Sequence, residues 1–239
     1  MILSLVLCIG YAVLLLCYRS FWVQSKEINV GANLAKDEKK PFISIIVPAR
    51  NEERNIGPLL TSLCKQTYDQ TFFEIIVVDD FSEDKTAAVV KSFTHVNVRY
   101  VSLKDVLGDL PINSYKKKAI EIGISVAKGA LIVTTDADCV ADERWIETIA
   151  DYYVMYNPDM IVMPVIMSKE KSFLQLFQQL DFMSLQGITG GVASKGFHQM
   201  CNGANLAYTK AIFYSVDGFK DIDNIASGDD MLLMQKIAK

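Results

Sequence analysis

Short apolar runs alternate with amphipathic stretches along most of the chain after residue 40. The apolar runs are typical of buried strands, and they cover residues 41–48, 73–80, 96–102, 130–136 and 160–165. Apolar residues at helical spacing occupy the stretches between them, at residues 55–66, 84–93, 115–128 and 142–155. Strands that are apolar on both faces and separated by helices predict an α/β fold, with a mostly parallel central sheet flanked by helices.

The N-terminal segment is the most apolar part of the chain. No charged residue lies between Ile2 and Tyr18, a length close to the ~20 residues that a helix needs to cross a bilayer. Basic residues follow this segment and none precedes it, so we expect a single-pass anchor in the cell inner membrane with the downstream domain in the cytoplasm. A cleaved signal peptide is the alternative, but the segment lacks a basic start and a small-residue cleavage site. We expect an anchor at residues 1–23, a linker at residues 24–40 and one domain at residues 41–239.

Residues 170–200 depart from the alternation. A helix there would carry a broad apolar face, while its polar positions are mostly glutamine. The apolar positions are Phe173, Leu176, Phe177, Leu180, Met183 and Leu185. Two interpretations stay open: the face packs against the domain, or the helix lies at the membrane surface beside a lipid-linked acceptor. The glycines at positions 187, 190, 191 and 196 predict a mobile loop.

Composition excludes several classes of protein. The net charge is −4, so a general nucleic-acid surface is not implied. Five cysteines without CxxC spacing indicate reduced thiols rather than a disulfide framework or a zinc site. The first turn between strand and helix lacks GxGxxG, which disfavours a dinucleotide-binding Rossmann domain. The remaining candidate chemistry is carried by acidic residues.

Acidic residues follow three of the predicted strands. Asp136 and Asp138 are one residue apart, and on an extended strand such positions point to the same side. Their repulsion favours a divalent cation between them. Ligands of open parallel sheets bind outside the carboxyl ends of the strands, so the three clusters are expected to meet in one crevice. The clusters are Glu52 and Glu53, Asp79 and Asp80, and Asp136 and Asp138.

Six motifs in a fixed order together resemble glycosyltransferase family 2. They are SIIVPARNEE (44–53), IIVVDDFSEDKT (75–86), KKKAIEIGI (116–124), TTDADC (134–139), NGANLAY (202–208) and SGDDMLL (227–233). The match spans nearly all of the chain after the apolar segment. The resemblance implies the GT-A fold of nucleotide-diphospho-sugar transferases and an inverting, membrane-anchored bacterial type of enzyme.

The resemblance also implies a donor site. Backbone and side-chain groups of the first βα turn would hold the nucleoside, one of Asp79 and Asp80 would accept a hydrogen bond from the base, and Lys117 or Lys118 would approach the nucleotide. We favour Asp80 over Asp79, and assign Lys118. The donor-binding residues implied by the family are Pro48, Ala49, Arg50, Glu52, Asp79, Asp80, Lys118 and Asp136.

The implied catalytic groups complete the site. Asp136 would face the ribose and the metal, and Asp138 would bind Mg²⁺ or Mn²⁺ directly, since these cations prefer oxygen ligands. Asp229 and Asp230 stand where the family has a Glu-Asp pair. By that match Asp230 is the general base and Asp229 its neighbour.

The expected function is metal-dependent transfer of a sugar from a nucleoside diphosphate donor to an acceptor hydroxyl at the cytoplasmic membrane face. A UDP-sugar is the favoured donor, and a glycan or lipid-linked acceptor in polysaccharide or glycolipid synthesis is the expected partner. The chain stops nine residues after Asp230, so we expect a C-terminal truncation. A nucleotide-sugar-binding remnant with weak or no turnover is the alternative, and a nucleotidyltransferase lacks the glycine-rich, lysine-terminated loop it would need.

Overall fold

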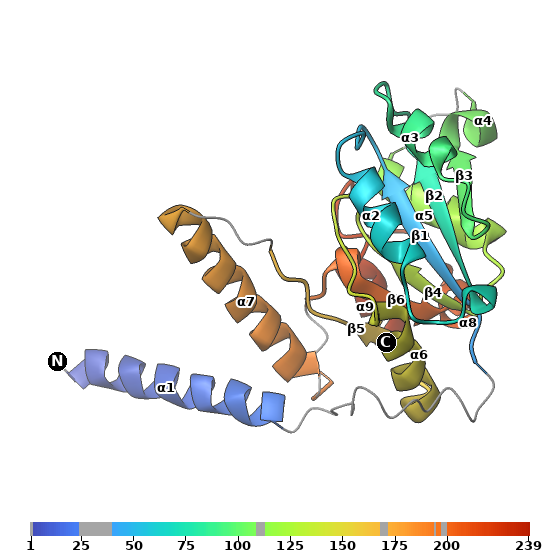
Figure 1. The fold of residues 1–239 in the computed structure, drawn as a ribbon. Coiled ribbons are helices and arrows are strands. Elements are labelled where there is room, and N and C mark those ends of the chain that lie inside the picture. Colours follow the sequence, from blue (N-terminus) through green and yellow to red (C-terminus); the bar gives the residue numbers. More distant parts are fainter. Residues whose placement is uncertain (1, 24–39, 109–112, 168–171, 194, 197–199) are drawn as a thin grey trace.

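The computed structural model describes residues 2–23, 40–108, 113–167, 172–193, 195–196 and 200–239 (Figure 1). Its strands are β1 (Ile43–Ala49), β2 (Phe73–Asp79), β3 (Val98–Ser102), β4 (Leu131–Thr134), β5 (Met160–Val162) and β6 (Leu206–Thr209). They form one sheet of six strands in the order β3-β2-β1-β4-β6-β5. The first four strands run parallel, whereas β6 is antiparallel to both β4 and β5. The predicted α/β fold with a mostly parallel sheet is confirmed.

The β5 edge of the sheet differs from the sequence prediction. The strand expected at residues 160–165 pairs only over Met160–Val162, and its partner β6 was not predicted. β6 has four residues, too few for an apolar pattern to separate a strand from a loop. Thr134 lies opposite Leu206 in the β4–β6 pair. This register brings the segment before β6 next to the carboxyl end of β4.

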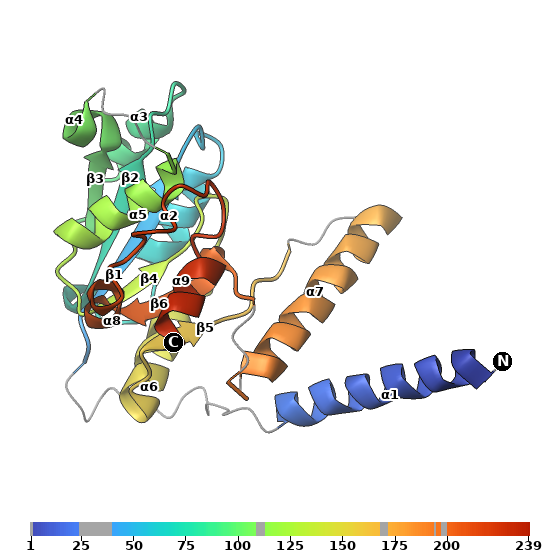
Figure 2. The same ribbon diagram turned by 180° about the vertical axis from the view of Figure 1, so that it is seen from behind.

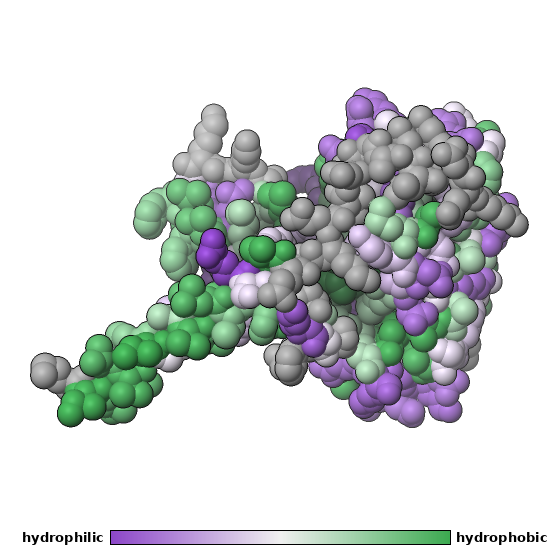
Figure 3. Space-filling model, turned by 90° about the horizontal axis from the view of Figure 1, so that it is seen from below, coloured by the Kyte–Doolittle hydropathy of each residue, from purple (hydrophilic) through white to green (hydrophobic). Residues whose placement is uncertain are grey.

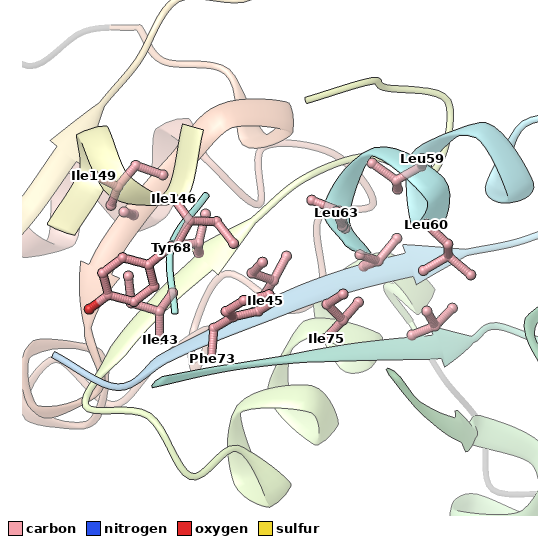
Figure 4. Close-up of a cluster of buried hydrophobic side chains, with 14 of the residues drawn as sticks. Ile43, Ile45, Leu59, Leu60, Leu63, Tyr68, Phe73, Ile75, Ile146 and Ile149 are labelled. Atoms are coloured by element: carbon pink, nitrogen blue, oxygen red, sulfur yellow. The ribbon is translucent and has the colours of Figure 1, made fainter. Parts of the chain in front are cut away.

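Helices cover both faces of the sheet. Those of the domain are α2 (Ile56–Cys64), α3 (Thr86–Ser92), α4 (Leu103–Leu107), α5 (Tyr115–Val126), α6 (Trp145–Tyr156), α8 (Lys210–Ser215) and α9 (Met231–Ile237), with short 3₁₀ turns η2 (Gln70–Phe72) and η3 (Gly203–Asn205). Ile43 and Ile45 point into a cluster with α2 and α6 (Figure 4). Ile46 points into a second cluster, with α5, α8 and α9. Successive side chains of a strand alternate between its faces, so β1 is apolar because both faces are buried.

The end of α5 differs from the helical stretch expected at residues 115–128. The helix ends at Val126, and Ala127 is already extended. Gly129 passes close to β1, where its N–H donates to Ser44 Oγ at 2.8 Å. A Cβ atom at this position would lie 2.7 Å from the Ser44 nitrogen. A side chain at residue 129 would therefore push the two segments apart.

α1 (Ile2–Val23) extends away from the domain as a 22-residue helix with no buried residue (Figure 1). A window of 18 residues within it has a mean hydropathy of 2.1. At 1.5 Å per residue such a helix is about 33 Å long, close to the thickness of a bilayer core. α1 is thus long and apolar enough to span a membrane, although a signal sequence would pass the same test. The predicted linker lies outside the described residues except for Lys40.

α7 (Phe173–Ala193) lies beside α1 rather than on the sheet (Figures 1 and 2). Its apolar side stays exposed, with Phe173 86% and Phe177 61% accessible, so it does not pack against the domain. Three of the glycines expected in a mobile loop, at 187, 190 and 191, are helical instead. They sit where α7 meets α1. A Cβ at Gly190 would collide with the ring of Trp22, so this glycine permits the close contact.

Candidate active site

The carboxyl ends of three strands meet at one edge of the sheet. Ala49 at the end of β1 lies opposite Asp79 at the end of β2, and the Asp80 N–H donates to the Ala49 carbonyl at 2.8 Å. On the other side of β1, the Thr135 N–H donates to the Ile46 carbonyl at 3.2 Å. These bonds extend the parallel pairing past the strand ends. Side chains that follow β1, β2 and β4 are therefore held near one another.

A cavity of about 230 Å³ opens at this edge. Seven of the residues predicted for the site line it, together with Lys116 and Ala137, which were not predicted. The lining residues are Pro48, Ala49, Arg50, Glu52, Asp80, Lys116, Asp136, Ala137 and Asp138. The expected convergence of three acidic clusters therefore holds in part. Glu53 and Asp79 do not line this cavity.

Asp136 and Asp138 reach the cavity by a different route from the one expected. β4 ends at Thr134, so neither residue is on an extended strand. Both follow the strand, where residues 137 and 138 form a turn, and Ala137 is buried between them with 4% exposure. The turn around the buried alanine, rather than the alternation of a strand, brings the two carboxylates to the same cavity.

Asp80 is the member of the second cluster that faces the cavity. Its Oδ1 is buried and has no hydrogen-bond partner among the described residues, and its Oδ2 lies 3.9 Å from Arg50. Burial raises the pKa of Asp80, Arg50 opposes this shift and Asp79 adds to it. An unpaired buried oxygen is costly, so its presence favours a ligand that donates a hydrogen bond there.

Asp79 has a structural role instead. Its Oδ1 accepts the Ser82 N–H at 3.1 Å, and its Oδ2 accepts the Tyr100 hydroxyl at 2.6 Å. The side chain is buried, with 6% exposure. Both oxygens hold the turn after β2 against β3, so Asp80 remains as the candidate for contact with a base.

Arg50 forms the outer wall of the cavity. Its guanidinium lies 5.2 Å from the ring centroid of Tyr115, in range for a cation–π contact. Tyr115 in turn meets Phe81 edge to face at 5.9 Å. Glu52 is tied into the first turn because its Oε2 accepts the Asn55 side-chain amide at 2.7 Å. Tyr115 was not predicted, since one aromatic residue at the start of a helix carries no functional signal.

Lys116 is a cation at the centre of the site. Its ammonium lies 2.8 Å from Asp136 Oδ1 and 3.5 Å from Asp229 Oδ2. Burial by itself lowers the pKa of Lys116, but the two carboxylates outweigh burial and raise it. The lysine therefore stays charged, and it connects the turn after β4 with the segment before α9.

Lys118, the lysine assigned to the nucleotide, lies away from the cavity. Lys118 pairs with Glu121 at 3.1 Å along α5 and lines neither of the cavities at the strand ends. Successive residues of a helix point about 100° apart, so three consecutive lysines face three directions. Helical spacing gave a usable signal: Lys116 lies one turn before the buried Ala119 and Ile120, on the side of α5 that faces the sheet.

Lys117 fastens the chain before α9. It is 1% exposed, and its ammonium donates to three backbone carbonyls, of Ile222 at 2.7 Å, Ile225 at 2.7 Å and Ser227 at 2.9 Å. Burial lowers the pKa of Lys117, while nearby acidic residues oppose the shift. These three hydrogen bonds fix the loop that leads directly into Asp229.

Asp229 and Asp230 lie next to each other in sequence but face different groups. Asp229 is 14% exposed and points toward Lys116. Burial raises the pKa of Asp229, Lys116 opposes that shift, and Asp230 adds to it. Asp230 caps α9: its Oδ1 accepts the Met231 N–H at 2.6 Å and its Oδ2 accepts the Gly203 N–H at 2.9 Å. The second bond ties α9 to the turn before β6.

A second, larger cavity of about 780 Å³ adjoins the first and shares Asp136 and Asp138 with it. One wall carries Trp145, whose indole N–H donates to Asn205 Oδ1 at 2.9 Å. Another wall is α7, which contributes Gln175 and Gln178. The two cavities together offer room for two substrates on either side of the same pair of carboxylates.

The acidic residues of the site fit a divalent cation that also binds a ligand. No group of three or more acidic, cysteine or histidine side chains within the described residues could hold a metal ion by itself. Asp136 and Asp138 nevertheless face one cavity, and Asp138 forms no ion pair with any residue that the structure describes. Mg²⁺ is commonly held by one or two carboxylates together with substrate phosphates. Two carboxylates are therefore sufficient if the ligand brings a diphosphate.

Fold and site together define the class of protein. An open, mostly parallel α/β sheet binds its ligands at the carboxyl ends of its strands, which is where this cavity lies. The family model described as glycosyl transferase family 2 matches residues 44–216. The chain belongs to glycosyl transferase family 2.

Two curated relatives illustrate the match in sequence. Glycosyltransferase AglE of Haloferax volcanii is 33% identical over 107 residues, which cover 45% of this chain and 34% of AglE. The probable glycosyltransferase YdaM of Bacillus subtilis is 27% identical over 204 residues, which cover 82% of this chain and 47% of YdaM. The chain thus spans less than half the length of these relatives.

Solved structures show the same fold. The mannosyltransferase PcManGT of Pyrobaculum calidifontis, in complex with GDP-Man and Mn²⁺, superimposes with a TM-score of 0.69 and 21% identity, covering 98% of this chain and 62% of PcManGT. TarS of S. aureus, residues 1–349 in complex with UDP-GlcNAc, gives a TM-score of 0.59 and 20% identity, covering 82% of this chain and 53% of that one. The expected GT-A fold is confirmed.

Proposed function

We propose that the protein transfers a sugar from a nucleoside diphosphate donor to an acceptor hydroxyl, with Mg²⁺ or Mn²⁺ and with inversion at the anomeric carbon. The observation that carries the proposal is one cavity in which Asp80, Lys116, Asp136 and Asp138 meet. Three parts of such a donor need recognition. The unpaired oxygen of Asp80 suits the base, the ammonium of Lys116 suits the diphosphate, and the carboxylates of Asp136 and Asp138 suit the metal bound to the diphosphate.

The donor lies along the edge of the sheet in this proposal. Asp80 Oδ1, which lacks a partner within the described residues, accepts an N–H of the base. Arg50 covers the base, and Glu52 binds the ribose from the first turn. The structures of relatives contain GDP-Man with Mn²⁺ and UDP-GlcNAc. They support a nucleoside diphosphate sugar, and a UDP-sugar remains the favoured donor.

The diphosphate lies between Lys116 and the carboxylates of Asp136 and Asp138. Breaking the bond from the anomeric carbon to the diphosphate oxygen leaves its electron pair on the diphosphate. A divalent cation held by Asp136 and Asp138 supplies neutralising charge there when bound. Lys116 places a further positive charge in the same cavity. Fixed charges aimed at a developing anion are an effective form of catalysis.

The acceptor occupies the larger cavity. Its hydroxyl oxygen forms the new bond from the face opposite the leaving diphosphate, which inverts the anomeric carbon, and its proton passes to Asp230. Asp230 lines neither cavity itself, but the Gly203 N–H that it accepts follows Asn202, which lines the larger cavity. A carboxylate has about four lone-pair sites, so the bonds from Met231 and Gly203 leave capacity for the hydroxyl.

The setting is the cytoplasmic face of the inner membrane in this proposal, with α1 as a single-pass anchor. Support comes from the length and hydropathy of α1 and from the basic residues after it. The acceptor is then a growing glycan or a lipid-linked sugar of polysaccharide or glycolipid synthesis. A reporter fused after Lys239 tests the orientation: activity of a cytoplasmic reporter supports it, and activity of a periplasmic reporter contradicts it.

Turnover is tested by incubating the protein in vesicles of membrane lipid with labelled UDP-sugars and Mn²⁺. We expect labelled product with the wild-type chain and none with Asp230→Asn or after chelation of the metal. Donor binding without product from the wild-type chain would instead favour a nucleotide-sugar-binding remnant. Absence of donor binding across UDP- and GDP-sugars would contradict the proposal as a whole.

A further inference from the structure

The polarity of α7 is reversed relative to a helix of a water-soluble domain. Its less exposed side carries three half-buried glutamines, Gln175, Gln179 and Gln186, together with the half-buried Phe182 and the buried Thr189. Its exposed side carries large apolar residues. These exposed residues are Phe173, Leu174, Leu176, Phe177, Leu180 and Met183.

A helix in water turns its apolar side to the protein and its polar side to solvent. α7 does the opposite, and it has no lysine, arginine or glutamate in its 21 residues. The surroundings of its outer side must therefore be apolar. Contiguous apolar surface of this kind marks contact with a membrane or another protein. Figure 3 shows the hydrophobic colouring gathered on the helices that protrude from the domain.

Continuity with α1, a candidate membrane span, favours lipid as these surroundings. α7 packs on the domain-proximal end of α1, where Gly190 meets the ring of Trp22 and Gly191 lies near the Tyr18 carbonyl. Aromatic residues of a membrane span are typical of the level of the lipid head groups. The contact between α7 and α1 therefore lies at the surface of the bilayer that α1 is able to cross.

The position of Asp181 limits how deeply α7 can enter the membrane. It is the helix's one acidic residue and lies on the exposed side, among the apolar residues. A carboxylate is costly in the hydrocarbon core but stays hydrated among head groups. Amphipathic helices that lie in the plane of the membrane bury their apolar side about 5–10 Å into the boundary between head groups and acyl chains. This depth accommodates both Phe177 and Asp181.

We propose that α7 lies in the membrane surface, with its outer side against lipid and its glutamine side facing the protein. Gln175 and Gln178 line the larger cavity, which also contains Asp136 and Asp138. The mouth of this cavity therefore opens beside the lipid head groups. Only the description of the cavity as the acceptor site rests on the proposed function; the contact with lipid does not.

Quenching of tryptophan emission by lipids with brominated acyl chains tests the proposal in the full chain. Phe177→Trp adds a tryptophan on the outer side of α7, and Gln178→Trp adds one at the next position, toward the cavity. Val96→Trp serves as a control, since Val96 is 90% exposed on the domain and far from α7 in sequence. The added emission is obtained by subtracting the spectrum of the wild-type chain in the same vesicles.

We expect brominated lipid to reduce the added emission of Phe177→Trp at least about twofold more than that of either other variant, because quenching needs contact with acyl chains. Equal weak quenching with blue-shifted emission at position 177 would show that protein covers α7 and would overturn the proposal. Equal weak quenching with red-shifted emission would show water there and would also overturn it. Calorimetry with UDP-GlcNAc and Mn²⁺ on the same samples separates this result from a failure of the proposed function.

Discussion

The ammonium of Lys116 lies 3.5 Å from the carboxylate of Asp229, and the same ammonium lies 2.8 Å from Asp136. One lysine therefore joins the turn after β4, which would hold the donor diphosphate, to the segment that carries the proposed base. Asp229, the residue before the proposed base Asp230, is therefore held beside the donor site. Its neighbours in sequence, Lys117 and Lys118, have other partners and supply matched comparisons.

Replacing Lys116 should impair catalysis more than folding. Lys116→Met removes a positive charge beside the diphosphate, so we expect the transfer rate to fall about 100-fold, the usual scale for loss of one electrostatic stabiliser. Lys118→Met is the control and should keep nearly full activity, because its exposed pair with Glu121 contributes little. Steady-state kinetics with a UDP-sugar measure both. Equal losses in the two variants would contradict the role of Lys116.

Replacing Lys117 should impair folding first. Lys117→Met leaves the carbonyls of Ile222, Ile225 and Ser227 without their shared donor in a buried position. We expect the free energy of unfolding to fall by about 2–4 kcal/mol, because the loss of three bonds at about 1.5–3 kcal/mol each is partly offset by removal of a buried charge and by packing of the methionine. Urea unfolding measures the change. A variant as stable as the wild-type chain would show that the hydrogen bonds of Lys117 are not needed for stability.

Asp80→Asn should stabilise the free protein at pH 7 while weakening donor binding. Burial raises the pKa of Asp80, so the folded protein keeps this proton to a higher pH than the unfolded chain does. Stability therefore falls as pH rises from the unfolded pKa through the folded one, and at pH 7 the full cost of the charge is present. Removing the charge should add about 1 kcal/mol, the low end of the cost of an unsatisfied buried group.

The gain from Asp80→Asn should shrink as the pH falls through the raised pKa and vanish below the unfolded value. Thermal unfolding at a series of pH values measures it. Asp79→Asn is the control and should destabilise, because it weakens the bonds to Ser82 and Tyr100. A loss of stability in both variants would argue that Asp80 is as well paired as Asp79.

The base assignment is separable from donor binding. Asp230→Asn should abolish transfer while leaving the affinity for a UDP-sugar within about threefold, since the amide oxygen still accepts a backbone N–H. Asp229→Asn should weaken donor binding, because it changes the surroundings of Lys116. Single-turnover rates and calorimetry on both variants decide between them. Normal transfer by Asp230→Asn would move the role of base to another residue.

Much of the fold followed from the sequence because the sheet is buried on both sides. Strands such as β1 and β2 are apolar at almost every position, and short uninterrupted apolar runs of this kind are typical of parallel strands covered by helices. β6 was missed because its four residues gain strand structure from pairing with β4 and β5, which no local pattern reveals. In the three-lysine run, Lys118 was assigned although Lys116 has the helical spacing to Ala119 and Ile120, and the structure sets Lys116 rather than Lys118 toward the cavity.

The site was predicted for partly different reasons from those that the structure shows. Asp136 and Asp138 were expected on one face of a strand and instead share a turn around the buried Ala137. The apolar side of α7 was visible in the sequence, but the direction in which it faces was not. Packing on the domain and contact with lipid both require an apolar side, so the sequence could not distinguish these two interpretations. The structure distinguishes them, because Gln175 and Gln179 are half-buried in it.

The central claim is that Asp138 and its neighbours hold a divalent cation together with a nucleoside diphosphate. Calorimetry of UDP-GlcNAc binding with and without Mn²⁺, on the wild-type chain and on Asp138→Asn, tests it most directly. We predict metal-dependent binding by the wild-type chain and a loss of at least about tenfold in affinity for the variant, because it replaces a charged metal ligand with a neutral amide. Affinity that is the same in both proteins, or unchanged by Mn²⁺, would contradict the account.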